Sequence, residues 1–232
     1  MNLKFLGTGA AFFPLLGSNS TYLEEDDKIL IIDVGDGIFK ELFKSDILNK
    51  GKEIFIITTH THSDHVGSLG TLLMYTGINN ITTNLIFGQN KDHKNRVLET
   101  IKCFGVPETN YNIIDESEVI SFNSFDNIEL FDVHHLSGVI ACGIKFTKDN
   151  KNTYYTGDTN DIEIVAKIIN ESNFERLYVD TSNEKTRAHI YLGDLNDTVP
   201  NTLKDKVWCM HFNNYECIEE AKKYGFNIAE KE

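Results

Sequence analysis

The chain has 232 residues, of which 41% are apolar and 25% are charged, a composition typical of a globular protein with an apolar core. Lysine and arginine number 22 against 35 aspartate and glutamate residues, so the formal net charge is −13. Proteins that bind long nucleic acids usually present a basic face, so this charge argues against a large RNA or DNA substrate. No apolar run approaches the roughly 20 residues of a membrane-spanning helix, and we expect no membrane partner.

The length fits one domain over residues 1–232. The opening residues MNLKFLGTGAAFFPLLG contain glycine and proline within their apolar stretch and have only Lys4 as a basic flank, which does not fit a signal peptide. The four cysteines form no CxxC pair, which favours buried thiols over disulfides. These features predict a cytoplasmic protein.

Strand and helix patterns alternate along the first half of the chain. Alternating or continuous apolar runs predict strands at residues 2–7, 21–24, 28–34, 53–58 and 83–87. Apolar residues at helical spacing predict helices at residues 35–49, 66–75 and 91–104.

The second half continues this pattern. Further strands are predicted at residues 111–114, 118–122, 127–133, 141–147, 152–156, 176–179 and 206–210, and helices at residues 161–170 and 215–224. This order of elements fits two sheets covered by outer helices.

The sequence HTHSDH, residues 60–65, is the most informative motif. It directly follows the apolar run EIFIITT and precedes the predicted helix VGSLGTLLMY. A loop that leaves a buried strand presents its side chains on a fixed backbone. Three histidines and one aspartate within six residues therefore indicate a metal site, because imidazole and carboxylate groups bind zinc, iron or manganese.

Three later strands also end in a metal-ligand type of side chain followed by a turn. These side chains are His134 or His135 in FDVHH, Asp158 in YYTGDT, and His211 in WCMHF. A single histidine at a strand end is usually structural, but the joint pattern favours ligands.

Together with LGTGAAFFP and KILIIDVGDG, these motifs resemble the metallo-β-lactamase superfamily over nearly the whole chain. The resemblance implies an α/β fold, a four-layer αββα sandwich. It also implies two divalent metal ions, with zinc as the first expectation and manganese or iron as alternatives. It places His60, His62 and His135 on one metal, Asp64, His65 and His211 on the other, and Asp158 between them. His135 is preferred to His134 because the family's ligand comes two residues after the apolar position that Val133 fills.

The aspartate of TGDT resembles the branch that holds tRNA 3′-processing endonucleases and cyclic-nucleotide or phosphonate-pathway phosphodiesterases. His189 lies at an interval before His211 similar to that of the branch's catalytic histidine, although Ile190 and Tyr191 follow it where the branch usually has serine or threonine. Only 22 residues, LSGVIACGIKFTKDNKNTYYTG, join His135 to Asp158, so the long tRNA-binding arm of the endonucleases is missing.

These observations predict a phosphodiesterase that acts on a small phosphate ester or cyclic nucleotide through a hydroxide bound by both metals. Asp64 would orient the nucleophile as well as bind metal, and His189 would protonate the leaving oxygen. A thioesterase or lactonase of the same fold is the alternative, with a tRNA endonuclease or a non-catalytic redox module behind it. Proteins of this branch are commonly dimers, so the resemblance is compatible with a homodimer.

The walls of the pocket are less defined by sequence. Thr8, Gly9, Phe12 and Phe13 follow the first predicted strand, where an aromatic ring could stack on a base or pack at the edge of the sandwich. Asn213 and Asn214 follow His211 and could bind substrate or cap the last helix.

Overall fold

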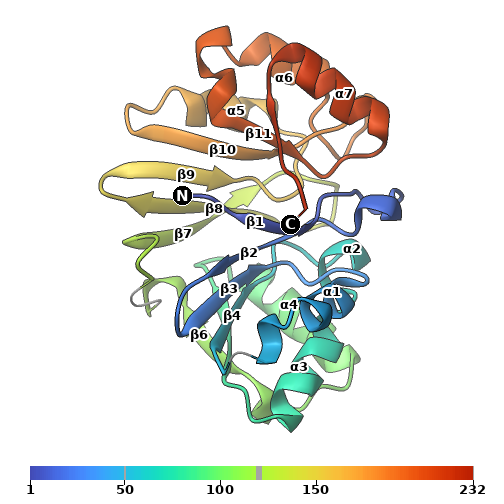
Figure 1. Cartoon of the computed structure of the whole chain (residues 1–232), viewed down its shortest axis with the longest axis vertical. Coiled ribbons are helices and arrows are strands. Elements are labelled where there is room, and N and C mark those ends of the chain that lie inside the picture. Colours follow the sequence, from blue (N-terminus) through green and yellow to red (C-terminus); the bar gives the residue numbers. More distant parts are fainter. Residues whose placement is uncertain (50, 119–121, 232) are drawn as a thin grey trace.

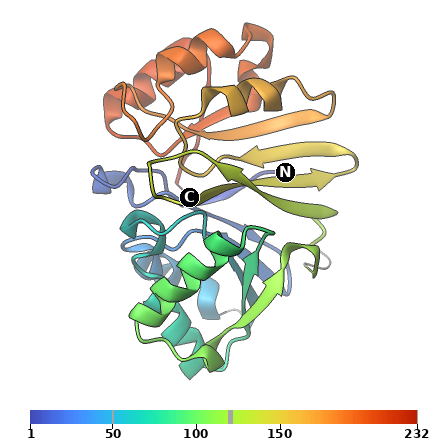
Figure 2. The same ribbon diagram turned by 180° about the vertical axis from the view of Figure 1, so that it is seen from behind.

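The computed structural model describes residues 1–49, 51–118 and 122–231. Two six-stranded sheets lie against each other in the middle of the molecule, and helices cover the outer face of each sheet (Figure 1). The view from behind shows the same four layers, with the amino-terminal half of the chain on one side and the carboxyl-terminal half on the other (Figure 2). The predicted four-layer α/β sandwich is therefore confirmed.

The first sheet is built by the amino-terminal half. Its strands follow chain order across the sheet: β1 (Lys4–Gly7), β2 (Ser20–Glu24), β3 (Lys28–Ile32), β4 (Glu53–Ile57), β5 (Thr83–Phe87) and β6 (Asn112–Asp115). β2 pairs antiparallel with both β1 and β3, and the remaining pairs are parallel.

The second sheet is built by the carboxyl-terminal half in the reverse order: β12 (Asn227–Ile228), β11 (Val207–Met210), β10 (Phe174–Asp180), β9 (Lys151–Tyr155), β8 (Ala141–Lys148) and β7 (Asn127–Val133). β8 runs antiparallel to both of its neighbours, whereas β9, β10, β11 and β12 are parallel. The carboxyl ends of β7, β9, β10 and β11 consequently lie at one edge of the sheet.

The helices on the first side are α1 (Ile38–Lys44), α2 (Ser63–Val66), α3 (Leu69–Ile78) and α4 (Lys91–Cys103), and those on the second side are α5 (Ile162–Ile169), α6 (Leu192–Thr198) and α7 (Tyr215–Tyr224). Short 3-10 helices are η1 (Pro14–Leu16), η2 (Ile47–Asn49), η3 (Glu108–Asn110), η4 (Glu116–Glu118) and η5 (Asn201–Lys206). None of the helices in the described ranges has the length and apolarity needed to cross a membrane.

Three apolar clusters hold the layers together. One lies between the sheets, and the others lie between each sheet and its helices. Strand β3 is buried on both faces. Ile29 and Ile31 face the helices, while Leu30 and Ile32 face the second sheet. A strand buried on both faces needs apolar side chains at every position.

The predicted elements differ from the structure mainly at helix ends. The helix predicted at 35–49 is shortened to α1, because Gly37 and Asp46 have left-handed backbone conformations that an α-helix cannot contain. The helix predicted at 66–75 is divided into α2 and α3, with Gly67 and Ser68 between them. Helix α6 and strand β12 were not predicted. Most of the strand predicted at 118–122 lies outside the described residues, and the single domain over 1–232 stays a prediction.

Gly35 lies between β3 and α1 and packs against the loop that carries HTHSDH. A Cβ atom on Gly35 would lie 1.8 Å from the carbonyl oxygen of Asp64 and 2.8 Å from the Cβ atom of Ser18. This close approach allows the backbone around residue 34 to bond the histidine loop, with the Val34 amide donating to the His65 carbonyl at 2.8 Å.

Gly35→Ala should therefore destabilise the protein by about 2 kcal/mol or more, since the clash is with backbone that cannot rotate away. Urea unfolding of the metal-free protein measures this. Gly105→Ala is the matched control, because Gly105 has positive φ but open space around its Cβ position and should lose only about 1 kcal/mol. A loss no larger for Gly35→Ala than for the control would contradict the packing argument.

Candidate metal centre

The HTHSDH loop starts where β4 ends and runs into α2. His62 is the residue before α2, and Asp64 and His65 lie in its first turn, where both are buried. Hydrogen bonds from the amides of Val34 and Asp36 to the carbonyls of His65 and Ser63 fix this turn against the segment after β3. The side chains of the motif therefore project from a rigid backbone.

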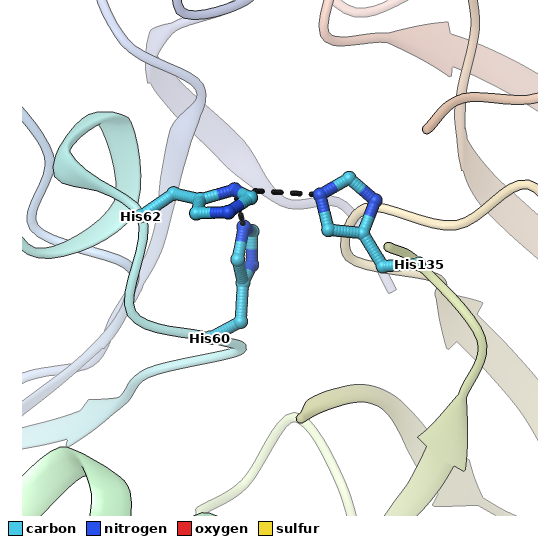
Figure 3. Close-up of side chains that lie close together, drawn as sticks. All are labelled: His60, His62 and His135. Carbon is cyan, nitrogen blue, oxygen red and sulfur yellow. Dashed lines mark hydrogen bonds between the residues drawn. The ribbon is translucent and has the colours of Figure 1, made fainter. Parts of the chain in front are cut away.

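His60, His62 and His135 form the first group of inward-pointing side chains (Figure 3). The Nε2 atom of His60 lies 2.9 Å from Nδ1 of His62, and Nε2 of His135 lies 3.3 Å from the same atom. Figure 3 shows the three rings meeting from two different parts of the chain. Three imidazole nitrogens within 4.8 Å of one another can bind one metal ion.

Asp64, His65, Asp158 and His211 form the second group, which is entirely buried. The Nε2 atom of His211 lies 3.2 Å from Asp64 Oδ2 and 3.3 Å from Asp158 Oδ2, and Nε2 of His65 lies 3.4 Å from Asp158 Oδ1. Asp158 Oδ2 is also 4.0 Å from Nε2 of His60 in the first group. The carboxylate of Asp158 thus lies between the two groups.

Asp33 orients the ring of His65 by bonding Nδ1, the nitrogen that does not face Asp158. It directly follows β3 in a left-handed conformation, and its Oδ2 atom accepts a hydrogen bond from His65 Nδ1 at 2.8 Å. The same carboxylate accepts hydrogen bonds from the amide and the hydroxyl of Thr59 at 2.7 and 2.8 Å. His93 donates its Nε2 hydrogen to the Thr59 carbonyl at 3.1 Å. Thr59, at the start of the loop, is therefore held by both Asp33 and His93.

His135 is oriented in the same way, and His211 lies beside a second buried carboxylate. His135 donates Nδ1–H to the Ala188 carbonyl at 2.8 Å, and Nδ1 of His211 lies 3.3 Å from Asp180 Oδ1. An outer partner on Nδ1 fixes the tautomer that leaves Nε2 free to bind metal.

Two competing effects set the pKa values in the site. Burial and the nearby His65 lower the pKa of His60 well below its usual value. Burial acts to raise the pKa of Asp158, but the charges of His211 and His65 outweigh it and lower that pKa. Burial acts to lower the pKa of His211, yet the carboxylates of Asp158 and Asp180 raise it to about 10. A metal ion bound by His211 would have to displace the proton that this raised pKa retains, so metal binding should weaken as the pH falls.

The residues of the second group fit a divalent cation. Buried polar atoms almost always have hydrogen-bond partners, but Nε2 of His65 and Oδ1 of Asp158 have none among the described residues. Both atoms belong to the second group and lie 3.4 Å apart, so their lone pairs are available to one ion. Nitrogen and carboxylate donors in such a set suit zinc, and also manganese or iron.

All seven metal ligands inferred from the sequence come together in these two groups. His134, the alternative to His135, is exposed and pairs through Nδ1 with Asn160 Oδ1 at 2.7 Å. His189 is adjacent to the second group, with Nδ1 3.8 Å from Asp158 Oδ2. Asp180 and Asp33 were not singled out from the sequence, although each follows an apolar strand in the same pattern as Asp158.

A cavity of about 680 Å³ opens over both groups. Phe12, Phe13, Asn213 and Asn214 line it, as do His189 and several of the metal-ligand candidates. Thr8 and Gly9, which were also considered as walls, are not among its lining residues; they lie in the buried base of the same loop.

Comparison with known proteins assigns the family. A family model described as Anti-Pycsar protein Apyc1 matches residues 1–231. The chain belongs to the anti-Pycsar Apyc1 family. The Anti-Pycsar protein Apyc1 of Paenibacillus harenae is 22% identical over 234 residues, which cover 92% of this chain and 90% of that protein.

Solved structures show the same fold. The metallo-β-lactamase fold protein YhfI from Bacillus subtilis has a TM-score of 0.74 at 16% identity, covering 98% of this chain and 95% of that chain. A diphosphatase from the PhnP family has a TM-score of 0.70 at 18% identity, covering 99% and 94%. The metallo-β-lactamase fold, inferred from the motifs, is confirmed.

Two adjacent histidines offer a test of the ligand set. His135→Ala should remove at least about one of two metal equivalents, because it deletes one of three ligands in the first group. His134→Ala is the matched control and should keep the wild-type metal content, since its ring faces Asn160 instead. Elemental analysis after equilibration with zinc measures both. Equal metal contents in the two variants would show that His135 is not a ligand.

Proposed function

We propose that this protein is a metal-dependent hydrolase of small phosphodiesters, with cyclic nucleotides as its substrate class. The observation that carries the proposal is the position of Asp158, which lies between two groups of ligand side chains and next to His189. These neighbouring groups would hold a pair of divalent cations, and such a pair supplies the charge stabilisation used for in-line displacement at phosphorus. Membership of the anti-Pycsar family fits a hydrolase that degrades cyclic nucleotides.

The divalent ions, when bound, would supply Lewis acidity that acidifies water and neutralises charge on the phosphate. Outer partners already fix two of the seven ligand residues before substrate arrives, since Asp33 holds His65 and the Ala188 carbonyl holds His135. Asp64 is suited to orient the attacking water as well as to bind metal. Burial acts to raise its pKa, but hydrogen bonds with His211 and His65 hold that pKa well below its usual value, so it remains an acceptor.

His189 is the candidate general acid. Its Nδ1 atom donates to Asp180 Oδ2 at 2.8 Å, and its side chain is 21% exposed at the wall of the cavity. Burial acts to lower the pKa of His189, but the charge and hydrogen bond of Asp180 raise it above its usual value. A protonated imidazole beside the ligand groups can protonate a leaving alkoxide. Asp180 also accepts from the amide of Thr159 at 3.0 Å, which keeps the carboxylate fixed.

The dimensions and charge of the protein support a small substrate. A cavity of about 680 Å³ is in the range of small-molecule sites. The net charge of −13 and the shortness of the hairpin of β8 and β9 between His135 and Asp158 argue against a long nucleic acid as the substrate.

A substrate screen tests the proposed reaction. Zinc- or manganese-loaded protein should hydrolyse bis-nitrophenyl phosphate and 3′,5′-cyclic nucleotides, and should leave lactones and thioesters largely intact. Asp158→Ala should lose most bound metal and at least about 99% of turnover, because one carboxylate serves both groups. Faster turnover of the acyl substrates would favour the thioesterase or lactonase alternative. Full activity and metal content in Asp158→Ala would contradict the bridging position.

The role of His189 can be separated from metal binding by the choice of leaving group. His189→Ala should lower kcat about 100-fold for a cyclic nucleotide, whose leaving alkoxide needs a proton. The loss should be much smaller for bis-nitrophenyl phosphate, because nitrophenolate is a stable anion. Metal content should stay at the wild-type level. Equal losses on both substrates would place His189 outside the proton transfer.

A further inference from the structure

We propose that Phe12 is the platform on which the base of the substrate stacks, and that Asn213 faces the edge of that base. This inference rests on the proposed function and extends it from the phosphate to the other end of the substrate. Phe12 is 100% exposed, yet it lines the same cavity as His62, Asp64 and His211. Aromatic side chains commonly line small-molecule sites, and an exposed ring at the mouth of this cavity is available to contact a ligand there.

The loop that carries Phe12 is fixed to the metal centre. The Phe212 amide donates to the Thr8 carbonyl at 2.8 Å, and the Ala10 amide donates to the Phe212 carbonyl at 2.9 Å. Phe212 follows His211 directly, so the base of the loop is paired with the residue next to a ligand. Gly9 makes this possible, because a Cβ atom there would lie 2.5 Å from the Phe13 carbonyl oxygen.

Figure 1 shows the result of this pairing. The dark-blue segment after β1, which includes η1, projects from the edge of the molecule between its two halves. The Phe13 amide donates to the Ala10 carbonyl at 2.9 Å, which closes the backbone turn that carries Phe12 next to the ligand groups.

The neighbouring aromatic residue, Phe13, has a different role. Its ring packs edge-on against Tyr215, with ring centroids 5.0 Å apart and an interplanar angle of 86°. This contact uses Phe13 to anchor the loop on α7. The ring of Phe12 has no ring contact among the described residues and keeps both faces free, which separates the two alternatives that the sequence left open for this loop.

Asn213 and Asn214 also differ in whether their side-chain amides already have hydrogen-bond partners. Asn214 caps α7, with Oδ1 accepting from the Cys217 amide at 2.7 Å and Nδ2 donating to Asn183 Oδ1 at 3.0 Å. Asn213 only accepts a long hydrogen bond of 3.4 Å from the Asn183 amide. Its Nδ2 donor has no partner in the described part of the chain, and the residue lines the cavity.

A cyclic nucleotide matches this layout. Its phosphate carries the negative charge and belongs at the metal ligands, while its base presents an aromatic face and a polar edge. Aromatic side chains stack on bases through the π-face, and an amide can donate to a ring nitrogen or a carbonyl of the base. A substrate without a base would leave Phe12 and Asn213 unused.

The test compares two substrates and three variants. The substrates are a 3′,5′-cyclic nucleotide and 1-deoxyribose 3′,5′-cyclic phosphate, which has the same ring phosphate but no base. Phe12→Ala should raise KM for the nucleotide about tenfold with kcat within about twofold, since stacking on one aromatic ring is lost. Phe12→Trp should keep the wild-type KM. Kinetics on the baseless substrate should not change in either variant.

Leu15→Ala is the matched control, because Leu15 is 73% exposed near Phe12 but does not line the cavity. It should behave as wild type on both substrates. The base platform is overturned if Phe12→Ala leaves the nucleotide KM unchanged, or if it affects both substrates equally. It is also overturned if Phe12→Ala changes the oligomeric state in light scattering, since the ring would then contact a second copy. If the wild type cleaves neither substrate, the proposed function itself fails, and this inference fails with it.

Discussion

The carboxylate of Asp158 lies fully enclosed between histidines that reach it from both halves of the chain. Burying an ionised group is costly unless it is paired or binds a metal. Here several imidazole nitrogens lie within 4.0 Å of the Asp158 oxygens, yet Oδ1 has no hydrogen bond among the described residues. The interior is therefore arranged for a positive charge at this point, and the surrounding structure has to maintain that arrangement.

The outer partners of the histidines maintain it. Asp33 holds His65, Asp180 faces both His189 and His211, and the Ala188 carbonyl holds His135. These partners come from ends of strands in both sheets and from the segment before α6. The apolar cluster between the sheets keeps the two halves in register, so its packing also positions the ligands. A core substitution between the sheets would thus be expected to disturb the site at a distance.

The ligand residues could be inferred from sequence because each follows an apolar strand, and the carboxyl ends of such strands meet at one edge. His135 could be distinguished from His134 only through the family resemblance. Asp180, like Asp158, is an acidic residue after an apolar run. It is not part of a recognisable motif, and it acts on the site by contacting His189 and His211. Helix α6 escaped prediction because LGDLNDT combines glycine, asparagine and aspartate, which are poor helix formers, with only two leucines. The position of Phe12 depends on backbone pairing with Phe212, which local sequence cannot reveal.

Charge balance connects the metal centre to the class of substrate. Two divalent cations would bring four positive charges, and the ligand carboxylates of Asp64 and Asp158 would offset two of them. Asp180 is already engaged with His189 and His211, so it offsets little of the remainder. The positive charge that would remain at the base of the cavity would favour a substrate with a single phosphate, while the net acidic charge of the protein disfavours a long polyanion. The proposed substrate, with one phosphate and an aromatic base, would suit both the metal ligands and the exposed ring of Phe12 above them.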